Sequence, residues 1–414
     1  MNRPLVALVD AYGTGMHLQA AFSALGADVV HVWSTPQPLP ALRAPELSPY
    51  RASLVCTDPV ATARELAAMN PAAVVAGQEP GVPLADILSE LLDLPTNGSA
   101  MSAARRNKYV MIEALRKAGL RCADQFKSDK VEPVVAWTQR RGSYPVVVKP
   151  LSGSGSQGVS ICSDATQVRR AAQAILGTTT MYGHDNIEVL AQSYLDGTEY
   201  IVDTVSCRGR HYTTVVWRYV KRRRNGRNIY HLNVLEPPDD PVVAEMAGYV
   251  HEVLDVIGIE FGPAHAEVMM TADGPALVEI GARLNGVMVP EVDGPCVGTD
   301  QATASALAYL RPDEFLAKLA GRTYRRDREA LVFFVETDLD GILARIDDDV
   351  MAEINRLDSV RAVNIKTRPG ERLRPTVDLP SSPMLVHLSN VSKTDLMNDY
   401  RRLGDLSRRL YHLV

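Results

Sequence analysis

A glycine-rich loop lies between two apolar runs in VVVKPLSGSGSQGV, residues 146–159, and it restricts the folds that this chain can adopt. Gly153, Gly155 and Gly158 have the G-x-G-x-x-G spacing of a dinucleotide-binding loop. A Rossmann fold needs a helix after these glycines, whereas the VSIC that follows reads as a strand. A Walker A loop has its lysine after the glycines, whereas Lys149 precedes them. The segment is therefore predicted to be a strand–loop–strand hairpin whose backbone N–H groups can approach phosphates.

Two interpretations of this hairpin stay open on the stretch alone. Protein kinases cover ATP with a loop of this type, but the kinase elements H-R-D and D-F-G are absent from the sequence. A mobile glycine-serine hairpin without a ligand is the alternative to a phosphate-binding flap.

A second hairpin, HAEVMMTADGPALVEIGARLNG from residue 265, carries two glutamates. Strands are predicted at 265–270 and 275–280, joined by the turn TADG. Alternation predicts a shared face for His265, Glu267 and Met269 on the first strand, and for Leu277 and Glu279 on the second. Closing the hairpin brings Glu267 near Glu279.

Two neighbouring carboxylates repel each other by about 1 kcal/mol in water and by several times that in a drier site. A divalent hard cation would offset the repulsion, and Mg²⁺ commonly takes one or two carboxylates plus substrate phosphates. Two surface glutamates that splay apart in water are the alternative. Glu267 and Glu279 are therefore candidate metal ligands.

A lysine faces the apolar side of a predicted helix in NGSAMSAARRNKYVMIEALRKAGL, for which Ser102 and Gly119 are the expected caps. Lys108 shares a face with Met111 and Leu115 at the spacing i, i+3, i+7. A solvated charge is the simpler reading. Lys108 would have a functional role only if a phosphate binds next to its side chain.

The segment EVLAQSYLDGTEYIVDTVS, residues 188–206, predicts a strand, a turn at Asp196–Gly197 and a second strand that begins near Glu199. Extended backbone at such a linker can bind the edge of an adenine, and the acidic residue can accept hydrogen bonds from ribose hydroxyls. Because any hairpin looks similar, this segment indicates nucleotide binding only in combination with the other motifs.

The chain divides into four predicted regions. Residues 1–98 alternate short apolar strands with helical patterns, which indicates a Rossmann-like parallel α/β unit. Residues 99–190 hold the helical lysine and the glycine loop, and residues 191–310 hold the linker and the paired glutamates. Residues 311–414 carry their own strands and helices and indicate a closing α+β region.

Composition excludes several classes of protein. A net charge of -5 argues against a nucleic-acid binder, and the basic run KRRRNGR at 221–227 contains an Asn-Gly turn typical of a solvated hairpin tip. No segment has the roughly 18 uncharged apolar residues of a membrane helix. The five cysteines are scattered without a C-x-x-C pair. We expect a cytoplasmic protein with no nucleic-acid or membrane partner.

Taken in order along residues 100–310, these elements resemble the ATP-grasp superfamily. The resemblance implies an ATP-grasp fold behind the N-terminal α/β unit, with ATP and Mg²⁺ (or Mn²⁺) as cofactors. It implies phosphate-binding lysines, a flap, an adenine hinge and a ribose acid at Lys108, Lys149, Gly153, Ser154, Gly155, Gly158, Gln192, Ser193, Tyr194, Leu195 and Glu199. It implies metal ligands at Glu267 and Glu279, and a catalytic arginine, Arg283, that steadies the acyl phosphate and the tetrahedral intermediate.

One departure from the superfamily concerns the metal site. Many members have Glu-x-Asn at the second metal position, whereas this chain has Gly281 in place of the asparagine. The third metal ligand is therefore in doubt, and Asn285 is the candidate substitute.

Within the superfamily, the N-terminal segment and VEIGARLNG are similar to the L-amino-acid ligases. The resemblance implies that ATP activates the carboxylate of one amino acid as an acyl phosphate, which an amine then attacks to give an amide. His265, Trp217 and Arg283 are the expected substrate neighbours, small-molecule amino acids the expected partners, and a homodimer the candidate assembly. A bicarbonate-activating carboxylase and a non-catalytic nucleotide-binding module are the alternatives.

Overall fold

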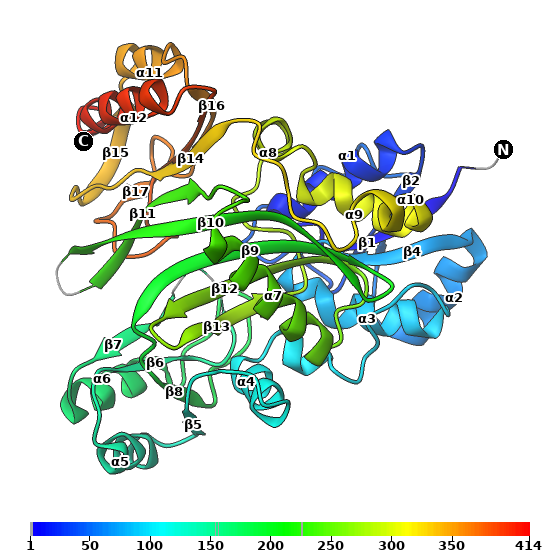
Figure 1. Cartoon of the computed structure of the whole chain (residues 1–414), viewed down its shortest axis with the longest axis horizontal. Helices are drawn as coiled ribbons and strands as arrows, with labels where there is room; N and C mark the ends of the chain where they lie inside the picture. Colours follow the sequence, from blue (N-terminus) through cyan, green and yellow to red (C-terminus); the bar gives the residue numbers. More distant parts are fainter. Residues whose placement is uncertain (1–2, 154, 156, 225–226) are drawn as a thin grey trace.

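The computed structural model of the chain describes residues 3–153, 155, 157–224 and 227–414. The flap residue Ser154 and the predicted turn at 225–226 lie outside the described residues. Figure 1 shows the N-terminal unit in blue at one end, long green strands through the middle and the C-terminal helices in orange and red at the other end. No helix in the described ranges is long and apolar enough to cross a membrane.

The N-terminal unit is built on a parallel sheet, as the alternation of strands and helices predicted. Its strand order is β3-β2-β1-β4, and all of its pairings are parallel. Its strands are β1 Leu5–Val9, β2 Asp28–Trp33, β3 Ala52–Val55 and β4 Pro71–Ala76. Its helices are α1 Met16–Ala24, α2 Pro59–Met69 and α3 Val82–Leu91, with short 3-10 turns at Gly13–Gly15 and Glu79–Gly81. The short βα loops of this unit place the 3-10 turns at the carboxyl edge of the sheet, where α/β proteins bind ligands.

A small antiparallel sheet follows, with the order β5-β8-β6-β7. Its strands are β5 Gln125–Ser128, β6 Val146–Pro150, β7 Ser160–Cys162 and β8 Val189–Ser193, and helices α5 Val131–Arg141 and α6 Ala165–Ile175 share its core. Strands β6 and β7 pair antiparallel, so the glycine loop joins two strands. The structure confirms the predicted hairpin.

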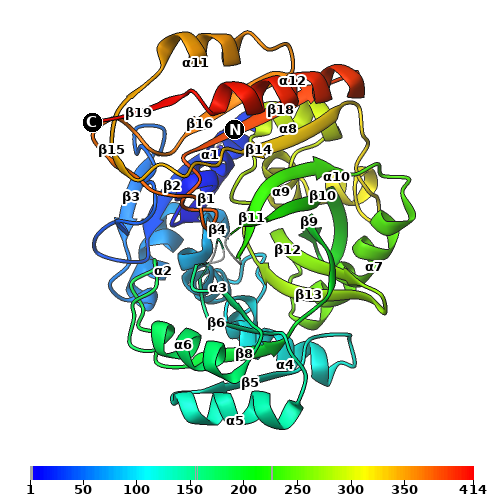
Figure 2. The same cartoon turned by 90° about the vertical axis from the view of Figure 1, so that its left-hand side faces the viewer.

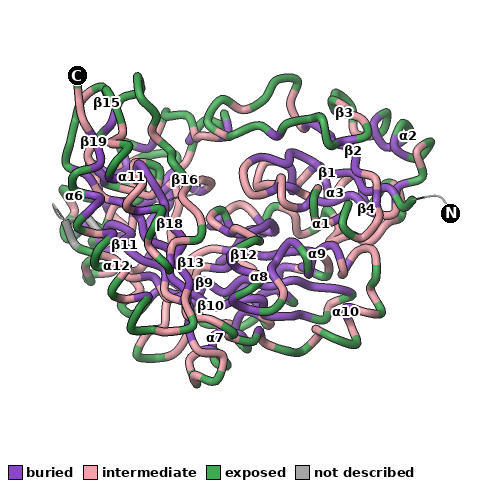
Figure 3. The backbone as a smooth tube through the Cα atoms, turned by 90° about the horizontal axis from the view of Figure 1, so that it is seen from above, coloured by how far each residue is buried: buried purple, intermediate pink, exposed green. Residues whose placement is uncertain are grey.

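The largest sheet has eight strands in the order β13-β12-β9-β10-β11-β14-β18-β16. Five of them come from the centre of the chain: β9 Gly197–Cys207, β10 Arg210–Arg224, β11 Arg227–Leu235, β12 Gly262–Thr271 and β13 Gly274–Gly281. Figure 3 shows long purple, buried stretches along these strands and green, exposed loops at the periphery. Helices α4 Lys108–Lys117 and α7 Pro241–Val256 pack into the same core as this sheet.

The strands of the C-terminal region are divided between two sheets, the eight-stranded sheet and a three-stranded sheet of order β17-β15-β19. Strands β14 Glu329–Phe334, β16 Val360–Ile365 and β18 Met384–Asn390 extend the eight-stranded sheet, because β14 pairs with β11. The region's other elements are α10 Pro312–Lys318, α11 Asp348–Asn355, α12 Lys393–Ser407, β15 Gly341–Ile346, β17 Arg372–Leu373 and β19 Tyr411–Leu413. Figure 2 shows this region above the small sheet, with α12 and β18 at the top. The domain limits at 98, 190 and 310 stay predictions.

Two helices and a turn connect the parts. Helices α8 Pro290–Val297 and α9 Gln301–Leu310 follow β13, and α9 residues share a hydrophobic core with α1 of the N-terminal unit. The 3-10 turn Ser102–Arg105 precedes α4. The core between α1 and α9 fixes the N-terminal unit against the end of the large sheet.

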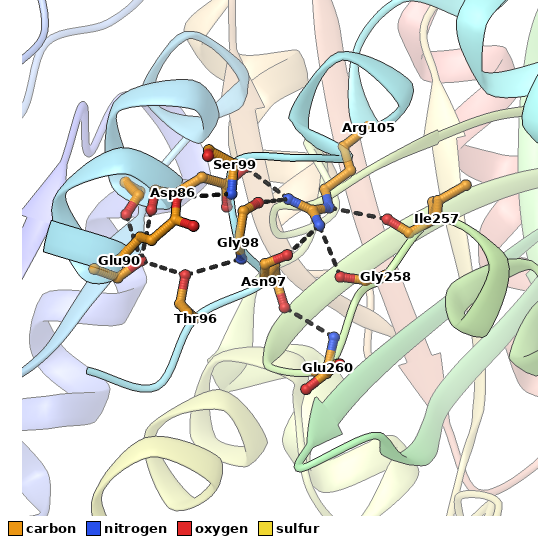
Figure 4. A network of polar contacts seen from close by, with 12 residues as sticks. Asp86, Glu90, Thr96, Asn97, Gly98, Ser99, Arg105, Ile257, Gly258 and Glu260 are labelled. Carbon is orange, nitrogen blue, oxygen red and sulfur yellow. Dashed lines mark hydrogen bonds and ion pairs between the residues drawn. The ribbon is translucent and has the colours of Figure 1, made fainter. Parts of the chain in front are cut away.

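Arg105 is the polar centre of this connection (Figure 4). Its side chain is fully buried, and its guanidinium forms an ion pair with Asp86 of α3 at 2.8 Å. It also donates to the backbone carbonyls of Asn97, Gly98, Ile257 and Gly258. Since these groups come from α3, the linker and the end of α7, one side chain joins three segments.

Candidate functional site

A cavity of about 730 Å³ lies between the small sheet and the large sheet. Apolar groups of β6, β7 and α6 line one part of it, including Val147, Ile161 and Ala171. Most of the residues predicted to bind a nucleotide and metal also line it: Lys108, Lys149, Gly153, Gly158, Gln192, Ser193, Tyr194, Leu195, Glu199, Glu267 and Glu279. An apolar slot beside a cluster of charges has the shape and polarity that a nucleotide needs.

Lys108 reaches the cavity from the first turn of α4. The helix begins at Lys108 and its N-cap is Asn107, whose side chain accepts from the backbone N–H groups of Tyr109 and Val110, so the expected cap at Ser102 was wrong. Ser102 instead begins the preceding 3-10 turn. The predicted apolar face is confirmed, because Lys108, Met111 and Leu115 are all buried.

Lys149 and Lys108 bring two positive charges to one end of the cavity. Burial, together with the charge of Lys108, lowers the pKa of Lys149 to about 8. Burial opposes the charge of Lys108 as well, but the carboxylates of Glu279, Glu79 and Glu267 together outweigh burial and raise the pKa of Lys108. The two ammonium groups therefore repel each other, and a phosphate between them would relieve that repulsion.

The two predicted metal glutamates face each other across β12 and β13, because Glu267 pairs with Glu279. This pairing depends on an irregularity: Val268 pairs with Leu277, so Val278 is an extra residue in β13. The predicted shared face of Leu277 and Glu279 was therefore wrong. Leu277 is buried in the core, whereas Glu279 turns to the cavity. A β-bulge is the device that places both carboxylates on one side of the sheet.

Glu267 is held in its charged form by its neighbours. Burial alone would raise its pKa, but the nearby His265 and two lysines lower it to about 2. His265 Nε2 lies 3.7 Å from Glu267 Oε1, and the hydroxyl of Tyr219 donates to the same oxygen at 3.4 Å.

Two facing carboxylates beside two lysines fit a hard cation that takes its remaining ligands from phosphates and water. No group of three or more His, Cys, Asp or Glu side chains among the described residues has the arrangement of a metal site. A cation bound here would therefore depend on the phosphates of a nucleotide to complete its ligand set.

Asp203, which was not among the predicted site residues, holds the residues behind Glu267. Its carboxylate lies 2.7 Å from His265 Nδ1 and accepts from Asn285 Nδ2 at 2.8 Å. The Asn285 side-chain oxygen accepts from the backbone N–H of Val287 at 2.9 Å. Asn285 is thus engaged with Asp203 and Val287, and its role as a metal ligand stays a prediction. Alternation along β9 from Glu199 would have found Asp203.

Glu199, predicted to bind ribose, is paired with a second residue that the sequence analysis did not single out. Lys221 Nζ lies 2.5 Å from Glu199 Oε2 and 4.4 Å from the centre of the Tyr230 ring. All three residues line the cavity. Lys221 belongs to the basic run that was predicted to be a solvated hairpin tip, so for this lysine the prediction was wrong.

Gln192, the first residue of the predicted adenine hinge, is held in a fixed position. Its side chain is buried and donates to Gln125 of β5 at 3.0 Å. Ser193 is tied to Asp124, whose backbone N–H donates to the serine hydroxyl at 3.0 Å. The residues that follow, Tyr194 and Leu195, leave β8 and border the cavity.

Of the three predicted substrate residues, His265 contacts a predicted metal carboxylate, Arg283 pairs with Glu79, and Trp217 lies in the core. His265 contacts Glu267, and Arg283 is buried beside Glu79 of the N-terminal unit, with Arg283 Nε 3.5 Å from Glu79 Oε2. Trp217 is 4% exposed and packs in the hydrophobic core with Ile201, because it stands two strands away from Glu267 and does not border the cavity. The structure does not bring Trp217 to the site.

A loop of the C-terminal region closes the cavity on the side of the glycine loop. Val377 and Asp378 line the cavity, and a Cβ added at Gly155 would lie 3.2 Å from Pro380. Gly155 itself does not line the cavity but faces this loop. The flap and the C-terminal region therefore meet over the same opening.

Comparison with known proteins gives consistent matches. Residues 142–291 match the ATP-grasp domain family. The chain is 32% identical over 417 residues to dapdiamide A synthase of Enterobacter agglomerans, a match that covers 100% of this chain and 98% of the relative. The crystal structure of an L-amino acid ligase from Bacillus licheniformis superposes with a TM-score of 0.78 at 20% identity and covers 100% of both chains. An ADP complex of N5-carboxyaminoimidazole ribonucleotide synthetase gives a TM-score of 0.71 at 15% identity, over 99% of this chain and 98% of that one.

Proposed function

The chain belongs to the ATP-grasp family, and we propose that it is an ATP-dependent ligase that joins the carboxylate of one amino acid, or a similar acid, to the amine of another. The products are an amide, ADP and phosphate. One observation carries the proposal: Lys108 bonds at once to the glycine loop and to Glu279, which stands opposite Glu267. Phosphate-binding and metal-binding groups thus meet at one point.

The nucleotide would lie with its base in the apolar slot near Ile161 and its phosphates toward Lys108 and Lys149. Glu199 and Lys221 border the slot between these two ends, where a ribose would lie. A divalent cation held by Glu267 and Glu279 would neutralise charge on the phosphates when it is bound. Catalysis in such a site consists mainly of positioning and electrostatic stabilisation.

The reaction begins when the carboxylate oxygen of the first substrate attacks the γ-phosphorus of ATP, which breaks the bond to ADP and gives an acyl phosphate. The amine of the second substrate then attacks the acyl carbon and loses a proton, and phosphate leaves. Arg283 carries a permanent charge, so it is suited to the oxygen that gains negative charge in this step. The flap and the loop at Val377 keep water away from the acyl phosphate, which would otherwise hydrolyse.

Two matches to known proteins bear on the alternative functions, a carboxylase and a non-catalytic module. A bicarbonate-activating carboxylase shares the fold, because an ADP-bound synthetase of the carboxyaminoimidazole type superposes over nearly the whole chain. The match to dapdiamide A synthase covers nearly both chains at higher identity and favours amide formation. A non-catalytic nucleotide-binding module would not need Arg283, a buried cation that pairs with Glu79 and is influenced by the charges of Glu279 and Glu267.

The test is a screen for ADP release and for new products by mass spectrometry, with ATP, magnesium, single amino acids, amino-acid pairs and bicarbonate. The proposal predicts an amide from at least one pair. It also predicts that Arg283→Ala binds ATP almost normally by calorimetry yet makes no amide. ADP release without an amide from any pair would favour the carboxylase, and wild-type amide formation by Arg283→Ala would remove this role of the arginine.

Further parts of the proposal rest on the family and the composition. Magnesium or manganese is the proposed metal, small amino acids are the proposed partners, and a cytoplasmic location and a homodimer are the proposed setting. Analytical ultracentrifugation of the purified chain tests the homodimer directly.

A further inference from the structure

Glu79 enters the site from the N-terminal unit, where the loop after β4 is packed tightly against the end of β1. A Cβ added at Gly77 would lie 2.5 Å from Ala11 Cα, and one added at Gly81 would lie 2.4 Å from the carbonyl oxygen of Val9. Only glycine allows such close approach of two backbones. The loop is therefore fixed in place, and Glu79 is fixed with it.

The carboxylate of Glu79 lies among cations at the edge of the proposed metal site. Its oxygens are 3.5 Å from Arg283 Nε and 3.7 Å from Arg106 Nε. Neither Nε atom has a hydrogen-bond partner in the described part of the chain, although both are buried. Arg283 Nη1 donates to the carbonyl of Leu284 at 2.8 Å, so the backbone holds one arm of the guanidinium while Glu79 faces Nε. Glu79 is thus positioned to set the direction of that guanidinium.

Gly281 provides the space that Glu79 occupies. A Cβ added at Gly281 would lie only 2.8 Å from Glu79 Oε2 and 3.5 Å from Arg283 Nε. This is the position where many ATP-grasp proteins have an asparagine. In this chain a carboxylate from a separate unit lies where that side chain would begin.

We propose that Glu79 is the positioning residue for Arg283, and that Gly281 is required because any side chain there displaces the Glu79 carboxylate. The proposal rests on the function proposed above, because it gives Arg283 a defined orientation toward the acyl group. Arg106 is held by the same carboxylate, so Glu79 bridges two cations on either side of it.

The contacts of Glu79 indicate that it positions the arginines and does not act as a third metal ligand. Burial raises the pKa of Glu79, and the charges of Arg283, Arg106 and Lys108 oppose this by favouring the carboxylate. The described residues also contain no group of three acidic or histidine side chains arranged to hold a metal. Glu79 therefore acts through the arginines.

The experiment is a mutant cycle between Glu79 and Gly281 in the full chain. Glu79→Gln, Glu79→Ala, Gly281→Ala and the double variant Glu79→Ala/Gly281→Ala are compared with Glu65→Gln, a control on the exposed face of α2. Gly281 does not have a positive φ, so alanine there tests the contact with Glu79 and not the backbone. Folding of each variant is checked by thermal melting, ATP affinity by calorimetry, and kcat for amide formation by mass spectrometry.

Glu79→Gln and Gly281→Ala should each lower kcat by about tenfold to a hundredfold, the loss expected for one charge-assisted contact, with ATP affinity unchanged. Gly281→Ala should cost less than about twofold when Glu79 is already alanine, because the displaced group is gone. Glu65→Gln should match the wild type.

Wild-type kcat in Glu79→Gln would overturn the inference. It would also be overturned if Gly281→Ala lowered kcat as much in the Glu79→Ala background as it does in the wild type. Should the wild type make no amide at all, the ligase proposal fails separately. In that case the rate of ADP release is measured for the same variants, with the carboxylate substrate that increases this rate most. The two outcomes given above would overturn the inference in this assay as well.

Discussion

Lys108 Nζ lies 2.7 Å from Glu279 Oε2 and donates to the carbonyl oxygen of Gly153 at 2.9 Å, so one ammonium group joins helix α4, the glycine loop and the carboxylate strand. Removing it leaves Glu279 without its ion-pair partner and the loop without an anchor.

Lys108→Met should therefore weaken ATP binding by about tenfold or more and lower kcat further, because a buried charge loses its partner and the phosphates lose a cation. The measurement is calorimetric titration with ATP and magnesium. Lys117→Met, at the exposed end of the same helix, is the matched control and should bind ATP normally. Equal affinity in the two variants would show that Lys108 does not contact the nucleotide.

Glu279→Ala should abolish most turnover while the protein stays folded. The loss of one of two facing carboxylates removes a ligand for the proposed cation, and kcat should fall by roughly two orders of magnitude or more. Turnover is followed as ADP release over a range of magnesium concentrations, with thermal melting as the check on folding. Near wild-type rates at saturating magnesium would rule out the metal assignment.

The affinity for ATP should depend on pH through Lys149. Burial and the charge of Lys108 lower its pKa to about 8, so the side chain is charged below pH 8 and loses its proton as the pH rises through 8. ATP affinity should then decrease by up to roughly tenfold per pH unit above 8, because the neutral lysine must take up a proton to bind phosphate. Lys149→Arg keeps its charge and should flatten this profile between pH 7.5 and 9.5, where the binding constants are compared. A wild-type profile that is already flat would contradict the prediction.

Arg105→Met should destabilise the fold by about 3–5 kcal/mol, since Asp86 stays buried without its partner and four backbone carbonyls lose their donor. Denaturant unfolding measures this free energy. Arg51→Met, which removes an exposed arginine that pairs with Asp28, is the control and should cost no more than about 1 kcal/mol. A loss of similar size in both variants would show that Arg105 does not connect the segments as described.

Local patterns in the sequence predicted much of the fold. The strand–loop–strand hairpin at Lys149, the parallel N-terminal unit and the helix that carries Lys108 are present as expected. The facing of Glu267 and Glu279 was predicted as well, but strict alternation would have placed them on opposite faces of the sheet. The bulge at Val278 turns Glu279 to the same side of the sheet as Glu267, and no residue type in that strand predicts a bulge.

The residues that were missed are brought to the site by contacts between distant segments. Glu79 lies some two hundred residues before Arg283, in a loop whose place depends on backbone packing between β1 and β4. Lys221 was read as part of a charged tip because neither its strand register nor the aromatic ring of Tyr230 beneath it can be seen in the sequence. Trp217 was expected near the substrate, yet its place in the core depends on the pairing of β10 with β9, which the sequence does not show.

The eight-stranded sheet has a consequence for how the protein is made on the ribosome. Strand β11 completes its pairing only when β14 emerges, about a hundred residues later, and the cavity lacks its last wall until Val377 and Asp378 have been synthesised. The nascent chain therefore presents an unpaired strand edge until β14 has been synthesised, and such an edge favours aggregation. A nucleotide cannot be fully enclosed before nearly all of the chain has left the exit tunnel, so cellular ATP can stabilise the complete protein more than its unfinished precursors.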